Sequence, residues 1–296
     1  MKKFYLFVCA LILSLNVLAE IPKNFKVYTS GVGISVPLCT KILNEYNRLY
    51  NTSAILVVKP GASSLIAIKE MANDKQFSIL CFTGLAENVF NPKLYPQFKE
   101  DHDKLTSIAA LSDNATLFYT RSGSPYKDLQ DLIANKQDLT IGTHNAFGKS
   151  IANLIVKNST KVVFVDYKNA RDSISSLVDG TLDLYIDGGG LVTSVEAGIL
   201  KSLGQFHAPK TVPWPDMSKY FPEASSLKGS TIISTSINAD KADIIKFGQN
   251  LREVMKNEGI IQEIKNSLGV PNFKSVEEVN KQLDLSRALY NKVNPD

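Results

Sequence analysis

The stretch that decides the fold is LTIGTHNAFGKS, residues 139–150. It predicts an apolar strand over 139–144 that runs through a glycine-containing turn into a helix. A second strand over 162–167, a helix from Asn169 and a third strand over 182–186 complete the unit. The first N–H groups of a helix lack helical partners, and the helix dipole is positive there, so such a turn is suited to bind an anion.

The same order of elements is predicted near the N-terminus. Short strands are expected over 25–29, 54–58 and 76–81, with helices over 36–49 and 65–73 between them. This βαβαβ order predicts a parallel sheet with right-handed crossovers, whose ligands lie beyond the carboxyl ends of the strands. Two such units, one early and one in mid-chain, predict two α/β lobes that hold one ligand between them.

The chain is predicted to cross between the lobes twice. A strand over 116–120 enters the second lobe, and a strand over 230–236 returns to the first. Helical periodicity follows over 239–257, 260–268 and 275–293. The expected domains are lobe 1, residues 20–115 with 229–296, and lobe 2, residues 116–228.

Composition is that of an ordinary globular protein, with 44% hydrophobic and 21% charged residues among 296. Lys2-Lys3, an apolar run over 4–17 and the short side chains of Val17-Leu18-Ala19 predict a secretory signal peptide, residues 1–19. The run is shorter than the ~20 residues of a membrane span. Without the signal peptide, 31 basic and 29 acidic residues leave a formal charge of +2. No basic stripe with interleaved aromatics indicates nucleic-acid binding.

The cysteines of the exported part, Cys39 and Cys81, leave two interpretations open. They either form a disulfide, as exported cysteines often do, or are two buried thiols, and the second interpretation is slightly favoured. No Cys-x-x-Cys pair or histidine cluster indicates a metal site, and no cofactor is expected.

Four serines lie at predicted helix starts, namely Ser35, Ser63, Ser64 and Ser150. At such a position a serine either caps the helix or contacts a ligand. The choice depends on whether the four helix starts converge on one cleft, which the sequence does not show.

Three further side chains follow predicted strands. His144 precedes a helix start, where it either reaches a ligand or has a structural role. Asp187 precedes three glycines, where it either accepts from a ligand or caps the turn. Lys168 either neutralises an acid or is solvated. No Gly-x-Ser-x-Gly elbow, P-loop or His-Glu-x-x-His motif accompanies them.

Taken together, these features resemble the periplasmic substrate-binding receptors of tripartite tricarboxylate transporters, the Bug receptor family. The resemblance covers nearly all of the exported part and depends on the order and spacing of several short stretches. They are YTSGVGIS (28–35), VKPGASS (58–64), AFGKSIA (146–152), VDYKN (165–169), DGTLD (179–183) and AGILKSL (197–203).

The resemblance implies an α/β, type II-like periplasmic binding protein, in which mostly parallel sheets flanked by helices enclose a ligand cleft. It implies that a small organic anion or related metabolite, bearing a carboxylate, is captured in the periplasm of a Gram-negative bacterium. The ligand is then delivered to inner-membrane transporter subunits. A monomer without enzymatic activity is expected. In this family, backbone N–H groups and ordered water at two glycine turns hold the ligand carboxylate.

The strand ends and the resemblance together predict one ligand-binding set. Its members are Ser30, Gly31, Val32, Gly33, Ser35, Thr83, Gly84, His144, Asn145, Phe147, Gly148, Ser150, Lys168, Asn169 and Asp187.

The family pattern is altered at several of its positions. Ser35 stands where the family has Asp, Ser63-Ser64 where it has Gly-Gly, Val32 where it has Gly, and Asp166 where it has Pro. An amino acid, an aromatic acid or a ligand without a carboxylate is therefore an alternative to a di- or tricarboxylate.

Two other functions remain open. One is an exported enzyme of the same fold that uses His144 with Asp187 or Asp183 as acid and base. The other is an interaction protein that presents its ligand to a membrane sensor.

Overall fold

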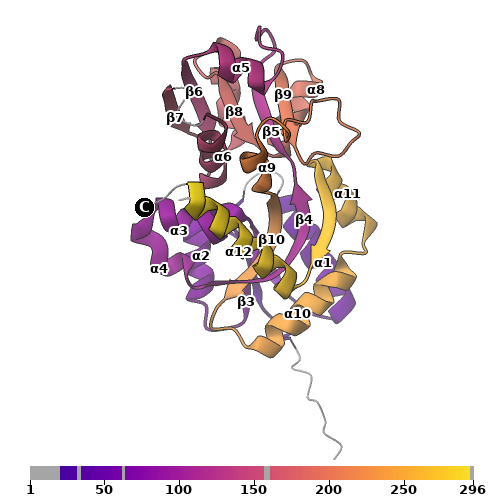
Figure 1. The fold of residues 1–296 in the computed structure, drawn as a ribbon. Helices are drawn as coiled ribbons and strands as arrows, with labels where there is room; N and C mark the ends of the chain where they lie inside the picture. Colours follow the sequence, from indigo (N-terminus) through magenta and orange to yellow (C-terminus); the bar gives the residue numbers. More distant parts are fainter. Residues whose placement is uncertain (1–20, 32–34, 62–63, 157–160, 294–296) are drawn as a thin grey trace, which may run out of the picture.

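Two β-sheets with helices on their faces form the protein, and strands pass from one sheet to the other (Figure 1). This computed structural model describes residues 21–31, 35–61, 64–156 and 161–293. The predicted signal peptide, residues 1–19, lies outside the described residues. None of the described helices is long and apolar enough to cross a bilayer. The predicted α/β class is confirmed, in the form of two mixed sheets.

The six-stranded sheet, here called the first sheet, takes strands from both ends of the chain. Its strand order is β11 (Gly269–Lys274), β4 (Leu105–Asn114), β10 (Gly229–Ser236), β3 (Ser78–Thr83), β1 (Lys26–Thr29) and β2 (Ile55–Val58). The predicted βαβαβ unit supplies its parallel part, in which β1 pairs with both β2 and β3. The later strands β4, β10 and β11 pair antiparallel.

The five-stranded sheet, here called the second sheet, is built around residues 139–150. Its strand order is β7 (Lys161–Asp166), β6 (Asp138–Thr143), β8 (Leu184–Asp187), β5 (Thr116–Arg121) and β9 (Leu200–Phe206). β6 runs parallel to β7 and β8, whereas β5 is antiparallel to β8 and β9. Because β5 continues from β4 of the first sheet, it enters the second sheet against the direction of the parallel strands (Figure 1).

Helices of eight residues or more flank both sheets. They are α1 (Ser35–Tyr50), α2 (Leu65–Ala72), α6 (Ala146–Val156), α10 (Lys241–Val254), α11 (Glu258–Asn266) and α12 (Val276–Val293). The shorter helices are η2 (Ala86–Phe90), α3 (Asn91–Leu94), η3 (Pro96–Phe98), α4 (Lys99–His102), α5 (Leu129–Asn135), η4 (Ala170–Ser173), α7 (Ile174–Asp179), η5 (Gly189–Leu191), α8 (Val192–Glu196) and α9 (Pro222–Ser226).

An aromatic cluster anchors α1 to the first sheet. Tyr46 of α1 stacks on Phe247 of α10 with 4.6 Å between ring centroids. Phe25 meets both rings edge-on, each at 5.8 Å. All three side chains are buried. Edge-on and offset-stacked contacts of this kind stabilise a core beyond the burial of area alone.

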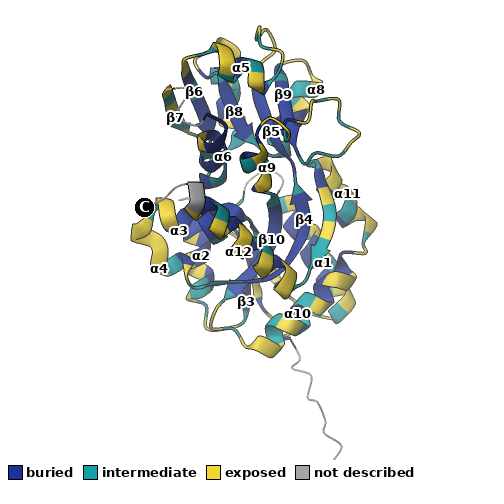
Figure 2. Cartoon of the chain, in the orientation of Figure 1, coloured by how far each residue is buried: buried dark blue, intermediate teal, exposed yellow. Residues whose placement is uncertain are grey.

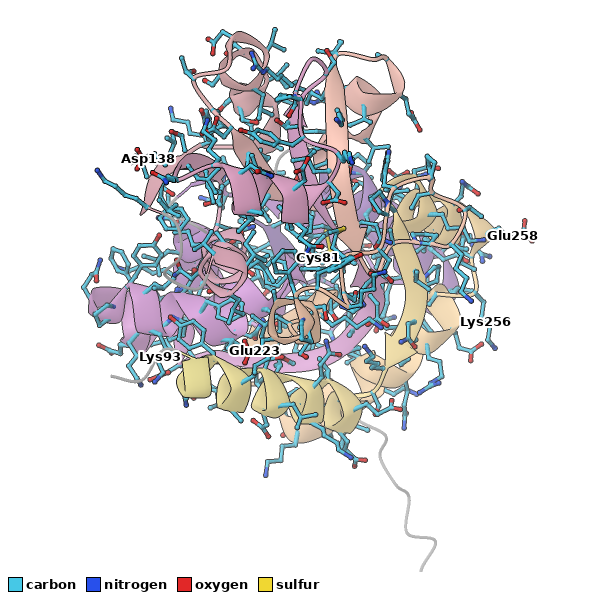
Figure 3. The ribbon with its side chains drawn as sticks, turned by 45° about the horizontal axis from the view of Figure 1, so that its top comes forward. Cys81, Lys93, Asp138, Glu223, Lys256 and Glu258 are labelled. Atoms are coloured by element: carbon cyan, nitrogen blue, oxygen red, sulfur yellow. A yellow bond between two sulfur atoms is a disulfide. The ribbon has the colours of Figure 1, made fainter. Side chains whose placement is uncertain are left out.

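Cys39 and Cys81 form a disulfide that joins α1 to β3, with 6.1 Å between their Cα atoms (Figure 3). The slightly favoured interpretation of two buried thiols is therefore wrong. The sulfurs are buried as that interpretation held, with both residues at most 1% exposed. The disulfide can form only because α1 lies directly across β3. This tertiary arrangement cannot be predicted from the spacing of the two cysteines in the sequence.

One buried cluster continues from the first sheet to the second. Phe90 of η2 lies 5.1 Å from the ring of Tyr290 in α12 and 6.1 Å from the ring of Phe147 in α6. The strands behind these helices are buried, and exposed residues lie on the outer helix faces (Figure 2). The two sheets are thus held in contact on this side by η2, α6 and α12.

Candidate functional site

The carboxyl ends of the parallel strands of both sheets lie beside the crossing between the sheets. β4 ends at Asn114 and β5 begins at Thr116, so one residue separates the two sheets there. Asp187, which ends β8, pairs with the second residue of β5. Thr83, which ends β3, pairs with the fourth residue of β10, and the first residue of β10 pairs with Asn114.

Two groups of residues lie at or next to these strand ends. The first edge comprises Ser30, Gly31, Ser35, Ser64, Gly84 and Glu87. The second edge comprises Thr143, His144, Asn145, Phe147, Gly148 and Asp187. Two predicted binding residues, Val32 and Gly33, lie outside the described residues.

A chain of hydrogen bonds links the three loops of the first edge. Ser30 Oγ lies 2.7 Å from Ser64 Oγ. The Ser64 hydroxyl donates to Glu87 Oε1 at 2.7 Å, and the Gly84 N–H donates to Glu87 Oε2 at 2.9 Å. Ser64 precedes α2 without capping it, so its hydroxyl serves the loops instead of the helix. Glu87 was not predicted, and its carboxylate is the centre of this edge.

Ser35 lies at the start of α1 and is 1% exposed. Its Oγ occupies the space where a Cβ on Gly31 would point, 1.4 Å away, so only glycine fits at position 31. The hydroxyl has no hydrogen-bond partner among the described residues. The predicted pair Gly31 and Ser35 is therefore in contact, directly after Ser30.

Thr83 faces the neighbouring strand rather than the loops. Its hydroxyl lies 3.0 Å from Ser234 Oγ and 3.1 Å from the Ile232 carbonyl oxygen, and the residue is buried. The Asn88 side chain donates to Thr83 Oγ1 at 3.3 Å and to the Gly84 carbonyl at 2.8 Å. Thr83 thus fastens β3 to β10 and positions Gly84.

Asn145 connects His144 to the start of α6 at the second edge. The Gly148 N–H donates to Asn145 Oδ1 at 3.0 Å, which places the Asn145 amide nitrogen 3.0 Å from His144 Nε2. The Asn145 side chain therefore connects the first turn of α6 to the His144 ring. Nδ1 lies 3.0 Å from the Tyr185 hydroxyl and 3.6 Å from Asp187 Oδ1. His144, Asn145, Gly148 and Asp187 form one cluster.

Tyr185 remains a neutral phenol beneath this cluster. Burial raises the pKa of Tyr185 well above its ordinary value, and the nearby charge of Asp187 raises it further. The Asp187 carboxylate lies against Gly190: a Cβ added to Gly190 would be only 2.6 Å from Asp187 Oδ2. Asp187 is thus placed to stabilise the glycine turn as well as to orient His144.

Phe147 is the residue through which the second edge meets the first. Its ring packs against Phe90, which closes the η2 helix that begins beside Gly84. A Cβ on Gly229, at the return crossing, would lie 3.8 Å from Phe147 Cζ. The first turn of α6 therefore faces the loop after β3.

Gly148 and Ser150 lie deeper in α6. A Cβ at Gly148 would lie 2.9 Å from Thr143 Cγ2 and 3.2 Å from the Ile186 carbonyl oxygen, so glycine lets α6 approach β8 closely. The Ser150 hydroxyl is buried and donates to the Ala146 carbonyl at 3.0 Å inside the helix. Ser150 thus bonds within its own helix.

Lys168 and Asn169 are not brought to either edge by the contacts of the described residues. Asn169 caps η4, with Oδ1 accepting from the Arg171 N–H at 3.0 Å and the Asp172 N–H at 3.3 Å. Lys168 is exposed. Their neighbour Tyr167 packs edge-on against Tyr185 at 5.9 Å, so the segment supports the second edge from outside.

Two more buried hydroxyls lie near the crossing. Thr143 Oγ1, at the end of β6, and Thr116 Oγ1, at the start of β5, have no hydrogen-bond partner among the described residues. Thr143 is 0% exposed and Thr116 is 1% exposed. An unpaired buried hydroxyl costs about 1–3 kcal/mol, so groups of this kind gather where a ligand or water completes the bonding.

Asp183, the other predicted acid partner of His144, is engaged elsewhere. Its carboxylate pairs with Lys136 and accepts from the Thr140 N–H at 2.9 Å. It precedes β8, whereas Asp187 ends that strand. Of the two predicted partners, only Asp187 lies beside His144.

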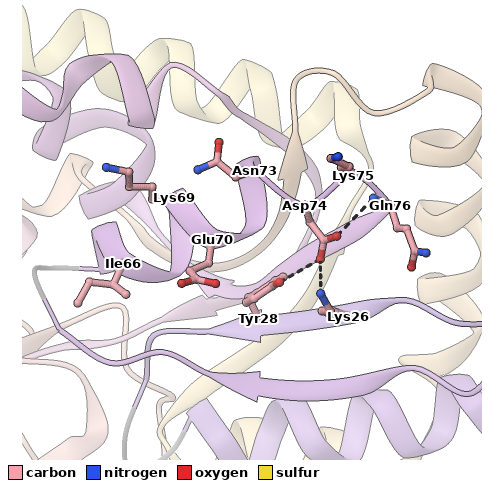
Figure 4. Close-up of a pocket in the computed structure, with 9 residues that line it drawn as sticks. All are labelled: Lys26, Tyr28, Ile66, Lys69, Glu70, Asn73, Asp74, Lys75 and Gln76. Carbon is pink, nitrogen blue, oxygen red and sulfur yellow. Dashed lines mark hydrogen bonds and ion pairs between the residues drawn. The ribbon is translucent and has the colours of Figure 1, made fainter.

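A separate surface hollow of about 700 Å³ lies at the opposite end of β1 (Figure 4). Asp74 at its centre accepts from Lys26 Nζ and from the Tyr28 hydroxyl, both at 3.0 Å, and from the Gln76 N–H at 3.3 Å. None of the predicted binding residues lines it. Its central carboxylate is occupied by the protein's own donors.

In the described part of the chain, no group of three or more His, Cys, Asp or Glu side chains is placed to hold a metal ion. The polar groups of both edges are hydroxyls, an amide, an imidazole, backbone N–H groups and isolated carboxylates. These groups suit an organic ligand bound by hydrogen bonds.

Gly189 is a point of close approach between the sheets. A Cβ there would lie 2.2 Å from the backbone oxygen of Ser267, which follows α11. We expect Gly189→Ala to lower the free energy of unfolding by about 1–3 kcal/mol, because backbone at both positions must shift. Urea denaturation measures the change. Gly123→Ala, where a Cβ meets nothing within 4 Å, is the control. Equal stability of the two variants would contradict the contact.

The sequence matches the model of the tripartite tricarboxylate transporter family receptor over residues 43–281. No curated protein matches the sequence significantly.

Solved structures share the fold over nearly the whole chain. MatC from Rhodopseudomonas palustris, solved with malate, has a TM-score of 0.77 at 14% identity, covering 92% of this chain and 99% of its own. An R. palustris protein solved with adipate has a TM-score of 0.77 at 14% identity, covering 92% and 96%. The periplasmic binding protein BugD has a TM-score of 0.74 at 12% identity, covering 92% and 97%. Because the family model matches most of the sequence, this chain belongs to the tripartite tricarboxylate transporter receptor family, a family of periplasmic solute-binding proteins.

Proposed function

We propose that this protein captures a small carboxylate-bearing metabolite between the first and second edges and delivers it to a tripartite tricarboxylate-type transporter of the inner membrane. The observation that carries the proposal is the contact of Phe147 with Phe90, which faces the first turn of α6 toward the loop after β3. Helix α6 has eleven residues, long enough for a positive N-terminal dipole end. The N–H groups of its first turn suit a carboxylate, apart from that of Gly148, which donates to Asn145 Oδ1.

Related structures support this ligand class. MatC was solved with malate and an R. palustris protein with adipate, both small dicarboxylates. The unpaired hydroxyls of Ser35 and Thr143, one on each edge, also favour a polar ligand between the edges. No catalytic step is proposed, because both ring nitrogens of His144 lie within hydrogen-bond distance of protein groups, Tyr185 and Asn145.

Binding is proposed to be coupled to movement of two lobes, residues 20–115 with 229–296 and residues 116–228. The crossing at Ala115, the single residue between β4 and β5, would serve as one hinge, and the return crossing at Lys228, directly before β10, as the other. The Cys39–Cys81 disulfide fits export to an oxidising compartment, which supports a periplasmic receptor. The receptor is proposed to act as a monomer.

Thermal unfolding with a panel of mono-, di- and tricarboxylates tests the proposal. A ligand that binds only the native state at 100 times its Kd adds about 2.7 kcal/mol to stability, so at least one acid is expected to raise Tm by several degrees. The uncharged amides of the same acids are the control and are expected to have no effect. A panel in which no carboxylate raises Tm above its amide would contradict the proposal.

A further inference from the structure

Phe82 is an extra residue in β3 that interrupts the pairing of this strand with β10. Ile233 pairs with Cys81 and Ile232 pairs with Thr83, so within the described strands Phe82 has no partner on β10. The φ angle of Phe82 is 70°, in the left-handed region. A β-bulge of this kind ordinarily has glycine at the left-handed position. A bulky aromatic residue there is strained, and strain of this kind is a reason to look for a function.

The bulge changes which face of the first sheet the end of β3 presents. Side chains alternate along a regular strand, so Phe82 would lie on the face opposite to Cys81. Instead, Phe82 packs against the same buried cluster as Cys81, on the face covered by α1. Thr83 lies on the other face, where its hydroxyl is 3.0 Å from Ser234 Oγ. Ser234 pairs with Leu80, which packs against α2. The extra residue has therefore turned Thr83 to the α2 face.

The loop at the centre of the first edge begins directly after this change of face. The Asn88 side chain donates to Thr83 Oγ1 at 3.3 Å and to the Gly84 carbonyl at 2.8 Å, so the orientation of Thr83 helps to fix the loop. The Gly84 N–H donates in turn to Glu87 Oε2 at 2.9 Å. The backbone conformation of Phe82 thus determines where Gly84 and Glu87 lie.

Both neighbours of Phe82 are held in place. Cys81 is bonded to Cys39 of α1, and both residues are at most 1% exposed. Thr83 is buried, and its hydroxyl donates to the Ile232 carbonyl at 3.1 Å. Because both sides are fixed on opposite faces, the chain passes through the left-handed region at Phe82. Backbone strain persists where the surrounding structure imposes it in this way, and such residues cluster at binding sites.

We propose that Phe82 is a positioning residue for ligand binding, whose left-handed backbone orients the loop from Gly84 to Glu87 toward the ligand. Phe82 acts through its backbone, since its ring packs on the face away from Thr83. This inference rests on the proposed function for its ligand, but the geometry of the loop can be tested without one.

Two substitutions separate the backbone conformation of Phe82 from the packing of its ring. Phe82→Asn removes the ring but tolerates the left-handed region, which asparagine adopts several-fold more often than most residues. Phe82→Val keeps an apolar side chain but is strained there, because it is β-branched. If the backbone conformation matters, Phe82→Asn is the milder change, whereas packing alone would make Phe82→Val the milder one. If Phe82→Val does not fold, Phe82→Gly and Phe82→Ala, which differ by one methyl group, test the same contrast.

Phe77 provides the matched control. It is partly buried and packs against the same cluster as Phe82, but it has no positive φ. At this position Phe77→Val is expected to be the milder change for stability, because only packing is altered. Neither Phe77→Val nor Phe77→Asn is expected to alter the loop from Gly84 to Glu87.

The first measurement is hydrogen–deuterium exchange of the ligand-free protein over residues 84–90, with β4 as the internal reference for overall stability. Phe82→Val is expected to speed exchange of this segment about tenfold relative to β4, because the strained bulge opens more often. Phe82→Asn is expected to leave the exchange rate within about threefold of the wild-type rate.

The second measurement is isothermal titration calorimetry with succinate, malate and adipate. When only a fraction of the molecules holds the binding conformation, the apparent Kd rises by the inverse of that fraction. For the acid that the wild type binds most tightly, Phe82→Val is expected to raise Kd about tenfold. Phe82→Asn is expected to raise it by less than about threefold.

Three results have different consequences. Exchange and affinity that change no more in Phe82→Val than in Phe82→Asn would overturn the inference, because packing would then account for Phe82. Faster exchange in Phe82→Val with an unchanged Kd would also overturn it, because the loop would then not hold the ligand. If no acid binds the wild type in the calorimeter or in the wider carboxylate panel, the proposed function fails by itself. The ligand-free exchange then still decides whether Phe82 positions the loop.

Discussion

Replacing Cys39 and Cys81 together with alanine is expected to lower the free energy of unfolding by about 4 kcal/mol and Tm by roughly 10 °C. The two residues are 42 positions apart, and closing a loop of this length removes that much conformational freedom from the unfolded chain. Alanine avoids leaving a buried hydroxyl in the core. Chemical denaturation of the oxidised wild type and the double variant measures the difference.

Reduction provides the control for this prediction. Both sulfurs are buried, so a reductant is expected to act only after the first sheet opens, and the double variant should be insensitive to it. A fully reduced wild type, verified by thiol titration, should unfold like the double variant. Unchanged stability of the reduced protein would show that the α1–β3 contact is held by packing alone.

Asp113→Asn is expected to destabilise the protein by about 3 kcal/mol, the cost of breaking a buried ion pair. The Asp113 side chain is 5% exposed, lies one residue before the end of β4 and pairs with Lys228 at 2.8 Å and with Lys274. The Asn272 amide donates to it at 2.7 Å. Because Lys228 precedes β10, this carboxylate ties together the two strands that carry the crossings.

The same carboxylate should make stability depend on pH. Burial raises the pKa of Asp113, but the hydrogen bonds from Lys228, Lys274 and Asn272 lower it by more than burial raises it. The pKa of Asp113 therefore lies below its ordinary value. A lowered folded pKa contributes stability above the unfolded pKa, near 4, and that stability is lost as pH falls through the folded pKa. Asp113→Asn should therefore lose less stability between neutral pH and acid than the wild type.

Asp284→Asn is the control for both effects. Asp284 is 74% exposed and pairs with Arg287 one helical turn away, so its removal is expected to change stability by less than about 0.5 kcal/mol. If Asp113→Asn behaves like Asp284→Asn at every pH, the ion cluster at the crossing contributes nothing to the fold.

Much of the fold could be predicted from the sequence because its parallel units follow local rules. The strand, glycine turn and helix over 139–150 appear as β6 and α6, since apolar periodicity and the Asn145 cap act within a few residues. β11 was missed. It is a six-residue edge strand with Pro271 inside it, and its pairing with β4 depends on a partner 155 positions away in sequence, at Gly269 and Asn114.

The sequence predicted which loops form the candidate site, but not which hydrogen bonds connect them. Serines at helix starts were recognised, yet Ser64 bonds to neighbouring loops rather than to its helix. Glu87 was overlooked, although its spacing from Gly84 matches a capping box and provided a local signal. Its role depends on three loops from different strands meeting, which is a tertiary property.

Hydrogen–deuterium exchange, with and without the tightest-binding carboxylate, tests most directly whether the ligand lies between the two edges. The loops after β1 and β3 and the first turn of α6 are expected to gain protection together, because one ligand orders both edges. The hollow around Asp74 should remain unchanged. Protection confined to that hollow, or to one edge alone, would contradict a site between the sheets.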